Sequence, residues 1–299
     1  MTTPFARSGP LWPVLEREGA VNASEWMNVA TWLEHELPEG ANRDVRIHWL
    51  TVPLALWLKR RTSQRSPLMV GLNAPQGAGK TTLTRSLVGV FAHVFGLRAV
   101  SLSVDDFYLR REEQLALATR HAGNRYLEHR GYPGTHDVPL GASVLAALRD
   151  GRDVALPRYD KSAHGGRGDR SSDVTWVRGR VDLVLLEGWM LGFKPVASVN
   201  DAALAVPNEL LRAYDAWNSL LDVFIALRMK SVDQVVRWRI EAEQAMRASG
   251  RPGLSDAEVE DYVRRFLPAY ELWRADAALT LTLDSERRPL LEASTDYRP

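Results

Sequence analysis

The residues with the clearest chemical meaning lie in the segment Ala74-Pro-Gln-Gly-Ala-Gly-Lys-Thr-Thr, between an apolar run and an amphipathic one. Glycines let successive backbone N–H groups converge on phosphate oxygens, and the helix that follows turns its positive end toward the anion. Lys80 has the reach for the β- and γ-phosphates, and the Thr81 hydroxyl is a ligand for Mg²⁺. The alternative is a chance glycine turn before a helix. We predict nucleotide binding by Gly77, Ala78, Gly79, Lys80, Thr81 and Thr82.

One position of this loop departs from the usual pattern G-x-x-x-x-G-K-[ST]. Ala74 stands where the pattern begins with glycine. Because alanine disfavours positive φ, the chain must enter the turn through ordinary backbone angles.

Carboxylates follow two apolar runs that have the form of buried parallel strands. Asp105 and Asp106 come directly after residues 99–104, and Glu187 comes after residues 181–186. The carboxyl ends of parallel strands face the ligand crevice of an α/β sheet. We therefore predict catalytic roles for Lys80, for Asp105 as the base that accepts a hydroxyl proton, and for Glu187 as a second Mg²⁺ contact beside Thr81. Helix capping and a solvated strand-end glutamate are the alternatives.

From residue 67 onward, short apolar runs alternate with amphipathic segments, which indicates an α/β fold with a parallel sheet flanked by helices. The predicted strands are Leu68–Leu72, Ala99–Val104, Val154–Leu156, Val181–Leu186, Val223–Leu227 and Ala278–Leu283. Helices are predicted near Thr81–Phe95, Glu112–His121, Gly141–Leu148, Asn208–Ser219, Ser231–Ala248 and Ser255–Trp273, the last with a capping box of Ser255 and Glu258. The polar, glycine-rich stretch 157–180 has a length that is usually functional or disordered.

Apolar residues recur at helical spacing before residue 66, among them Trp26, Val29 and Leu33. We predict a helical extension over residues 1–66 that packs on one large domain over residues 67–299. The cations Lys59, Arg60, Arg61 and Arg65 permit a nucleic-acid interpretation, but a charged surface connector is the simpler one.

Composition narrows the classes of protein further. The 299 residues are 45% hydrophobic and 25% charged, and the net charge of +1 gives no attraction to nucleic acid or to an acidic membrane. No apolar run approaches the roughly 20 residues that cross a bilayer. Zero cysteines exclude disulfides and thiolate zinc sites, and the histidines form no metal-binding pair. The first residues lack the features of a secretory signal or a transit peptide, so we expect a cytoplasmic location.

The order of the glycine loop, Asp105–Tyr108 and Glu187–Gly188 resembles the phosphoribulokinase, uridine kinase and pantothenate kinase group of P-loop kinases. Longer strings between about residues 68 and 273 look like D-glycerate 3-kinases of the plant and cyanobacterial type. They are Ala74-Pro-Gln-Gly, Ser103-Val-Asp-Asp-Phe-Tyr-Leu, Arg130-Gly-Tyr-Pro-Gly-Thr-His-Asp, Pro157-Arg-Tyr-Asp-Lys-Ser-Ala-His-Gly-Gly-Arg-Gly-Asp-Arg, Glu187-Gly-Trp-Met-Leu-Gly-Phe-Lys-Pro and Arg237-Trp-Arg-Ile-Glu-Ala-Glu-Gln-Ala-Met-Arg.

The resemblance implies a P-loop NTPase fold and transfer of the ATP γ-phosphate to D-glycerate with Mg²⁺, giving 3-phosphoglycerate and ADP. In that family Ala74-Pro-Gln is the usual form of the loop. Asp105 matches the proposed base of the group, Lys80 and Thr81 match its phosphate and metal contacts, and Glu187 matches its second acid.

Glycerate is a small anion with two hydroxyls, so its site should supply cations and a few neutral hydrogen-bonding groups. We expect these groups on residues 157–170, an inserted substrate loop, and on the segment before the helix near residue 141. Arg170, Lys161 and Tyr159 are favoured for the carboxylate and Asp137 for a hydroxyl; a solvated loop charge is the alternative for each. The full predicted set is His136, Asp137, Arg158, Tyr159, Lys161, Arg167 and Arg170.

Arg237 and Arg239 fall on the helix where this kinase group has its lid, and they are predicted to contact the nucleotide. Residues two apart cannot share a helix face, so at most one of the two is expected to point at the phosphates.

The glycine loop alone is also compatible with three other functions. A sibling kinase acting on pantothenate, uridine or ribulose phosphate would share every P-loop argument. A GTP-binding regulator is disfavoured because the chain has no Asn-Lys-x-Asp and no Asp-x-x-Gly switch. A non-catalytic nucleotide-binding scaffold is disfavoured because the lysine, the threonine and both acids are present. The sequence gives no indication of the oligomeric state.

Overall fold

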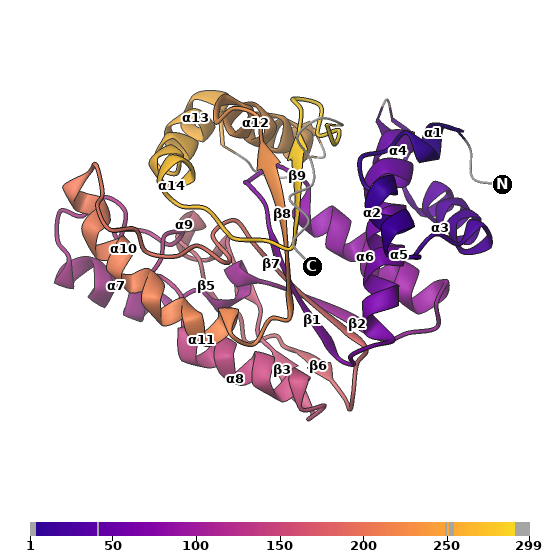
Figure 1. Cartoon of the computed structure of the whole chain (residues 1–299). Helices are drawn as coiled ribbons and strands as arrows, with labels where there is room; N and C mark the ends of the chain where they lie inside the picture. The colour runs from indigo at the N-terminus through magenta and orange to yellow at the C-terminus, as the bar shows by residue number, and fades with distance from the viewer. Residues whose placement is uncertain (1–3, 41, 249, 251–253, 291–299) are drawn as a thin grey trace.

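The computed structural model describes residues 4–40, 42–248, 250 and 254–290. Its centre is a parallel sheet with the strand order β2-β7-β1-β8-β9 (Figure 1). The strands are β2 Ala99–Ser103, β7 Leu183–Gly188, β1 Leu68–Asn73, β8 Val223–Met229 and β9 Leu279–Leu283. β1 and β7 are buried along their whole length, as expected for parallel strands covered on both faces. This sheet confirms five of the six predicted strands.

The two faces of the sheet belong to separate hydrophobic clusters. On β1, Leu68, Val70 and Leu72 face the cluster that includes α5 (Val52–Thr62) and α6 (Lys80–His93). Met69 faces the other cluster, with α8 (Val138–Arg149) and α11 (Asp215–Asn218). This alternation follows from the two-residue period of a strand. Figure 1 shows the two helical layers on either side of the sheet.

The extension before residue 66 is helical, as expected. It contains α1 Pro4–Arg7, α2 Trp12–Arg17, α3 Ala23–Glu36, α4 Arg43–Val45, the π-helix η1 Arg46–Thr51, and α5. Its buried residues share one cluster with β1 and α6, so the extension and the sheet have a common core. The boundary at residue 66 therefore stays a prediction, and residues 1–3 and 291–299 of the two predicted regions lie outside the described residues.

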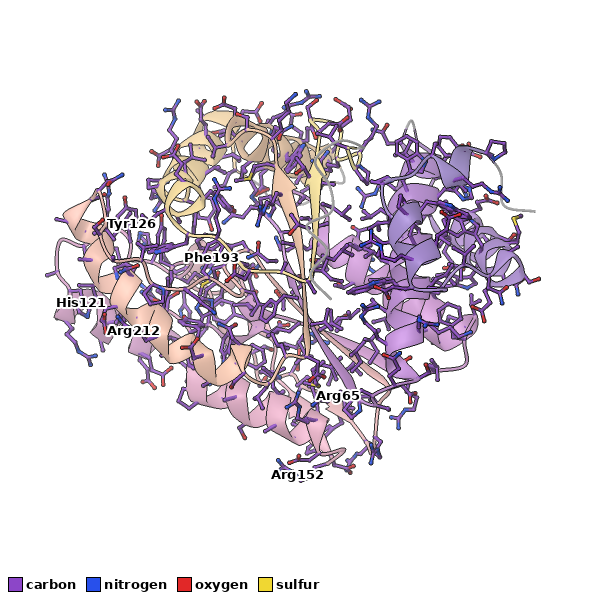
Figure 2. The ribbon with its side chains drawn as sticks, viewed as in Figure 1. Arg65, His121, Tyr126, Arg152, Phe193 and Arg212 are labelled. Atoms are coloured by element: carbon purple, nitrogen blue, oxygen red, sulfur yellow. The ribbon has the colours of Figure 1, made fainter. Side chains whose placement is uncertain are left out.

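The basic run at the end of the extension is engaged within the molecule. Lys59 pairs with Glu25 and Arg61 with Glu18. Arg65 pairs with Asp222 at 3.1 Å, at the amino-terminal edge of the sheet where Figure 2 labels Arg65. These ion pairs support the surface-connector interpretation. Within the part of the chain that the structure describes, no helix is long and apolar enough to cross a membrane.

The predicted strand Val154–Leu156 exists as β3, but its placement in the parallel sheet was wrong. β3 pairs antiparallel with β6 (Thr175–Val177) in a separate two-stranded sheet. The stretch 157–180 leaves β3 and returns to it as β6, so the short strand finds its partner locally. Between them, β4 (Tyr159–Asp160) pairs with β5 (Asp169–Arg170), and the short helix α9 (Ala163–Gly166) lies at the turn. Residues 157–170 are called the substrate loop below.

The C-terminal part begins with α12 (Asp233–Ala248), which lies with α13 and α14 over the carboxyl edge of the sheet (Figure 1). The predicted single helix Ser255–Trp273 is instead two helices, α13 Asp256–Arg264 and α14 Leu267–Leu272. Pro268 near the start of α14 lacks the N–H that a continuous helix needs, which explains the break. The Ser255–Glu258 capping box is confirmed.

The remaining helices are short. The predicted helix Asn208–Ser219 is broken into α10 Ala205–Leu210, the 3₁₀ turn η4 Leu211–Tyr214, and α11. The other elements are η2 Val104–Phe107, α7 Arg111–Arg120 and η3 Ala202–Leu204.

Candidate active site

The glycine loop joins β1 to α6, as the sequence predicts, and two of its glycines are sterically required. Gly77 and Gly79 have φ of 77° and 86°, values that residues with a side chain rarely adopt. A β-carbon on Gly77 would also lie 2.7 Å from Cβ of Trp238 on α12. Ala74 is fully buried and is not among the described residues with positive φ, which confirms the expected ordinary backbone there.

Lys80 begins α6 and folds back over the loop. Its Nζ donates a hydrogen bond to the carbonyl of Pro75 at 3.1 Å. Burial lowers the pKa of Lys80, while the nearby carboxylates of Glu187 and Asp105 oppose that shift. The ammonium therefore lies between the loop and both predicted acids.

Glu187 and Asp105 reach the same edge because β2 and β7 are neighbours. Ser103, the last residue of β2, is in register with Glu187, and Asp105 follows two residues later in η2. Glu187 is only 5% exposed, and its Oε1 accepts a hydrogen bond from the Thr81 hydroxyl at 3.0 Å. Burial raises the pKa of Glu187 despite the opposing charge of Lys80. Two oxygen ligands are thus held together beside the loop.

The two adjacent aspartates have different surroundings. Asp106 caps η2, since its Oδ2 accepts the Ser103 backbone N–H at 3.2 Å. Asp105 instead faces the substrate loop, where Lys161 Nζ lies 2.5 Å from its Oδ2. Burial acts to raise the pKa of Asp105, but Lys161 and then Lys80 outweigh it and hold that pKa well below its ordinary value.

The other predicted cations of the substrate loop have protein partners. Arg158 contacts Asp106 at 3.4 Å, and Arg167 lies 3.1 Å from the His129 ring. Arg170 is largely buried and donates to Asp137 Oδ2 at 3.0 Å and to the Tyr108 carbonyl at 3.1 Å. Lys161 is therefore the predicted loop cation that the structure brings to Asp105.

Three further predicted substrate residues lie around this point. Asp137 caps α8 by accepting the Leu140 N–H at 3.0 Å, in addition to pairing with Arg170. His136 is 4% exposed, and its Nδ1 lies 2.7 Å from the Tyr214 hydroxyl. Burial lowers the pKa of His136 to about 4, so the ring is neutral at pH 7. Tyr159 packs edge-on against Tyr108, with ring centroids 5.2 Å apart.

Arg237 and Arg239 point in different directions from α12, as their spacing predicts. Arg237 pairs with Glu241 at 2.9 Å and with Glu286 at 2.8 Å. Arg239 pairs with Glu243 at 2.9 Å, and its charge acts on Lys80. Arg237 shares Glu241 with Arg287, whereas the charge of Arg239 acts on Lys80.

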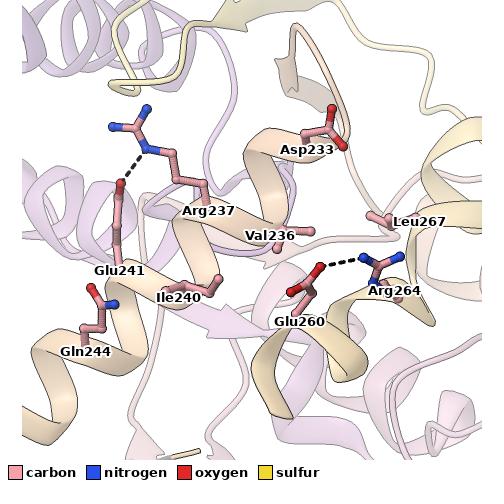
Figure 3. A pocket seen from close by; sticks show the side chains of 9 residues that line it. All are labelled: Asp233, Val236, Arg237, Ile240, Glu241, Gln244, Glu260, Arg264 and Leu267. Atoms are coloured by element: carbon pink, nitrogen blue, oxygen red, sulfur yellow. Dashed lines mark hydrogen bonds and ion pairs between the residues drawn. The ribbon is translucent and has the colours of Figure 1, made fainter. Parts of the chain in front are cut away.

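Figure 3 shows a hollow of about 480 Å³ between α12 and α13, with Leu267 of α14 also lining it. Arg237 and Arg264 lie across it from each other, each paired with a glutamate of its own helix. The hollow contains none of the loop, strand-end or substrate-loop residues named above; it is lined by Asp233, Val236, Arg237, Ile240, Glu241, Gln244, Glu260, Arg264 and Leu267.

Four residues near the site were not predicted from the sequence. Arg287 donates to the Gly77 carbonyl at 2.8 Å, and the Arg46 guanidinium lies against Gly79. Arg130 holds the substrate loop by donating to the carbonyls of residues 166 and 167. The charges of four site residues act on the hydroxyl of Tyr262 on α13, namely those of Asp105, Arg130, Arg239 and Lys161. The contacts join residues far apart in the chain, so no local pattern identified them.

A strand–loop–helix with these contacts, completed by two acids at neighbouring strand ends, defines a nucleotide-binding protein of the P-loop class. The comparisons with known proteins narrow this class. The chain is 38% identical over 290 residues to chloroplastic D-glycerate 3-kinase of Arabidopsis thaliana, a match that covers 86% of this chain and 63% of the length of that protein. It is 32% identical over 260 residues to the uncharacterized kinase mug58 of Schizosaccharomyces pombe, covering 78% of this chain and 94% of that protein.

Among solved structures, D-glycerate 3-kinase from Cryptococcus neoformans superposes with a TM-score of 0.75 at 29% identity, covering 84% of this chain and 98% of that one. No family model matches the chain. The chain belongs to the family of P-loop kinases that includes these D-glycerate 3-kinases.

Proposed function

We propose that this chain transfers the γ-phosphoryl group of ATP to D-glycerate and releases 3-phosphoglycerate and ADP. The observation that carries the proposal is the convergence of Lys80, Glu187 and Asp105 at one edge of the sheet, opposite the loop cation Lys161. Family membership supports it, since two relatives are named as D-glycerate 3-kinases.

The nucleotide would bind through backbone N–H groups of residues 77–82, with Lys80 leaving the Pro75 carbonyl for the β- and γ-phosphates. Arg239 is the lid cation whose charge acts on Lys80. Its partner Glu243 is on its own helix, so the guanidinium can turn toward a phosphate without unfolding the lid. Arg237 as a nucleotide contact stays a prediction.

Thr81 and Glu187 fit Mg²⁺. Both supply oxygen ligands, which this ion prefers. The Thr81 hydroxyl oxygen and Glu187 Oε1 are already 3.0 Å apart. In the described part of the chain, no group of three or more histidine, cysteine or acidic residues could hold a metal by itself. This agrees with a metal that takes its remaining ligands from phosphates and water. When bound, Mg²⁺ would neutralise charge on the β- and γ-phosphates.

Asp105 is the base in this proposal, but Lys161 must first release it. A carboxylate whose pKa is far below neutral accepts a proton poorly. The glycerate carboxylate is an alternative partner for Lys161, so substrate binding would free Asp105 and raise its pKa. The 3-hydroxyl oxygen would then bond to the γ-phosphorus as its proton passes to Asp105, and the bond from that phosphorus to the ADP oxygen would break.

The same arrangement accounts for the position that is phosphorylated. A carboxylate held by Lys161 keeps the adjacent 2-hydroxyl back and lets the primary 3-hydroxyl extend toward the γ-phosphate. Arg170 and Asp137, which hold each other, would position the substrate loop. Direct substrate contacts by His136, Asp137, Arg158, Tyr159, Arg167 and Arg170 stay predictions.

The test is an assay of purified protein with Mg·ATP and D-glycerate, with the two phosphoglycerates separated by NMR. Production of 3-phosphoglycerate is expected. L-glycerate, pantothenate, uridine and ribulose 5-phosphate serve as competing acceptors in the same assay. Faster turnover of any of these compounds would contradict D-glycerate as the phosphoryl acceptor. A predominance of 2-phosphoglycerate would contradict the proposed placement of the glycerate carboxylate at Lys161.

A further inference from the structure

Arg46 extends from the helical extension onto the glycine loop. Its two terminal nitrogens lie 3.0 and 3.4 Å from the point where a β-carbon on Gly79 would be. A β-carbon at position 79 would crowd the guanidinium, so glycine eases this close approach. The arginine is the first residue of the π-helix η1, and the next residue, Ile47, is fully buried. The side chain is therefore carried by an anchored element.

The extension also contacts the C-terminal segment beside the loop. Asn42 donates a hydrogen bond to the Glu286 carbonyl at 3.2 Å, and the next residue, Arg287, donates to the Gly77 carbonyl at 2.8 Å. Two guanidinium groups from opposite ends of the chain thus flank the loop, Arg287 at Gly77 and Arg46 at Gly79.

The two arginines differ in how their charge is balanced. Arg287 pairs with Glu241 at 2.7 Å. Arg46 is half-buried and forms no ion pair or side-chain hydrogen bond with any residue that the structure describes. Burial and the neighbouring charge of Arg287 lower the pKa of Arg46, yet a guanidinium stays charged at neutral pH. A half-buried charge without a partner is unfavourable unless an anion completes the site.

We propose that Arg46 binds the phosphate chain of the nucleotide, so that the extension completes the nucleotide site. This inference rests on the proposed function, because it takes the glycine loop as the site of ATP. The planar fork of a guanidinium matches two phosphate oxygens and suits an anion held at the amino end of α6. A π-helix is a rare element that occurs frequently at functional sites, which agrees with its position here.

The test compares fluorescent mant-ATP and mant-ADP binding to the full-length wild type and to Arg46→Ala. A charge-assisted contact predicts at least about tenfold weaker binding of both nucleotides to the variant. Arg60→Ala is the matched control, since it removes the same charge from an exposed site of the same extension. Among the described residues, the Arg60 side chain donates a hydrogen bond only to the Gly19 carbonyl. Its affinity should equal that of the wild type.

Competition by unlabelled adenosine separates a phosphate contact from a purine contact. Adenosine affinity should be unchanged in Arg46→Ala; a loss equal to that of ATP would place Arg46 on the base and overturn the proposal. Arg46→Gln gives the same test with less change in volume if the alanine variant does not fold. Wild-type affinity for ATP in either folded variant would also contradict the role of Arg46, but it would not contradict the glycine loop as the ATP site. Absence of nucleotide binding to the wild type would overturn the proposed function itself.

Discussion

Lys161 Nζ on the substrate loop lies 2.5 Å from Asp105 Oδ2 at the end of β2. The contact joins the glycine-rich substrate loop to the carboxyl edge of the central sheet. It stabilises the charged form of the proposed base and leaves the substrate carboxylate as its natural competitor. In the proposed reaction, the substrate loop would therefore take part in the chemistry as well as in recognition.

Lys80→Met should lower kcat by roughly 10² or more, because the variant loses the positive charge that lies near the loop and both acids. The fold should persist, since the side-chain hydrogen bond that is lost is a single one to Pro75. Steady-state kinetics and circular dichroism measure the two effects. Arg85→Met, which removes an exposed cation five residues further along α6, is the control. A loss of only a few-fold in Lys80→Met would contradict the role of the loop.

Asp105→Asn should lower kcat by roughly 10² or more with little change in ATP affinity, as expected when a general base is removed. Asp106→Asn is the matched variant. It weakens the cap of η2, so it should mainly lower stability, by about 1 kcal/mol. Single-turnover kinetics and urea unfolding distinguish the two. If Asp106→Asn were the more damaging change to kcat, the roles of the two aspartates would be reversed.

Lys161→Ala should raise the KM for glycerate about tenfold or more while leaving the KM for ATP nearly unchanged. The variant also removes the charge that holds the pKa of Asp105 below its ordinary value. The acidic limb of the kcat/KM profile should therefore move to higher pH. Arg152→Ala, which removes an exposed cation outside the substrate loop that pairs with Asp150, should do neither. Equal effects from the two variants would contradict a specific role of Lys161.

His136 should make the fold sensitive to acid. Its pKa of about 4 in the folded protein is below the ordinary 6.5, so the unfolded chain binds more protons between these values. Stability should be full above about pH 6.5 and should fall as the pH drops toward 4, by up to about 3 kcal/mol from this group. Urea unfolding at several pH values measures the slope. His136→Gln should flatten it relative to the wild type, and an unchanged slope would argue against a buried neutral ring.

The sequence by itself determined the parts of the site that are local in the chain. Gly77 to Thr82, Asp105 and Glu187 each stand where an apolar run ends, and a buried parallel strand has a pattern that can be read from a few neighbouring residues. The predicted meeting of these residues at one edge follows from the parallel arrangement of the strands. The positions of the helices were largely predicted from the sequence. The prediction of one continuous helix over Ser255–Trp273 was wrong, because Pro268 lacks an N–H and divides α13 from α14.

Tertiary structure alone decided which of several equivalent residues face the site. The substrate loop offers several cations of similar local character, but only folding assigns Arg170 to Asp137 and Lys161 to Asp105. The strand at Val154–Leu156 has an ordinary strand pattern, yet its pairing with β6 keeps it out of the main sheet. Arg46 and Gly79 are neighbours only in space. Periodicity reports the face that a residue presents, whereas a contact between distant segments depends on the packing of the whole core.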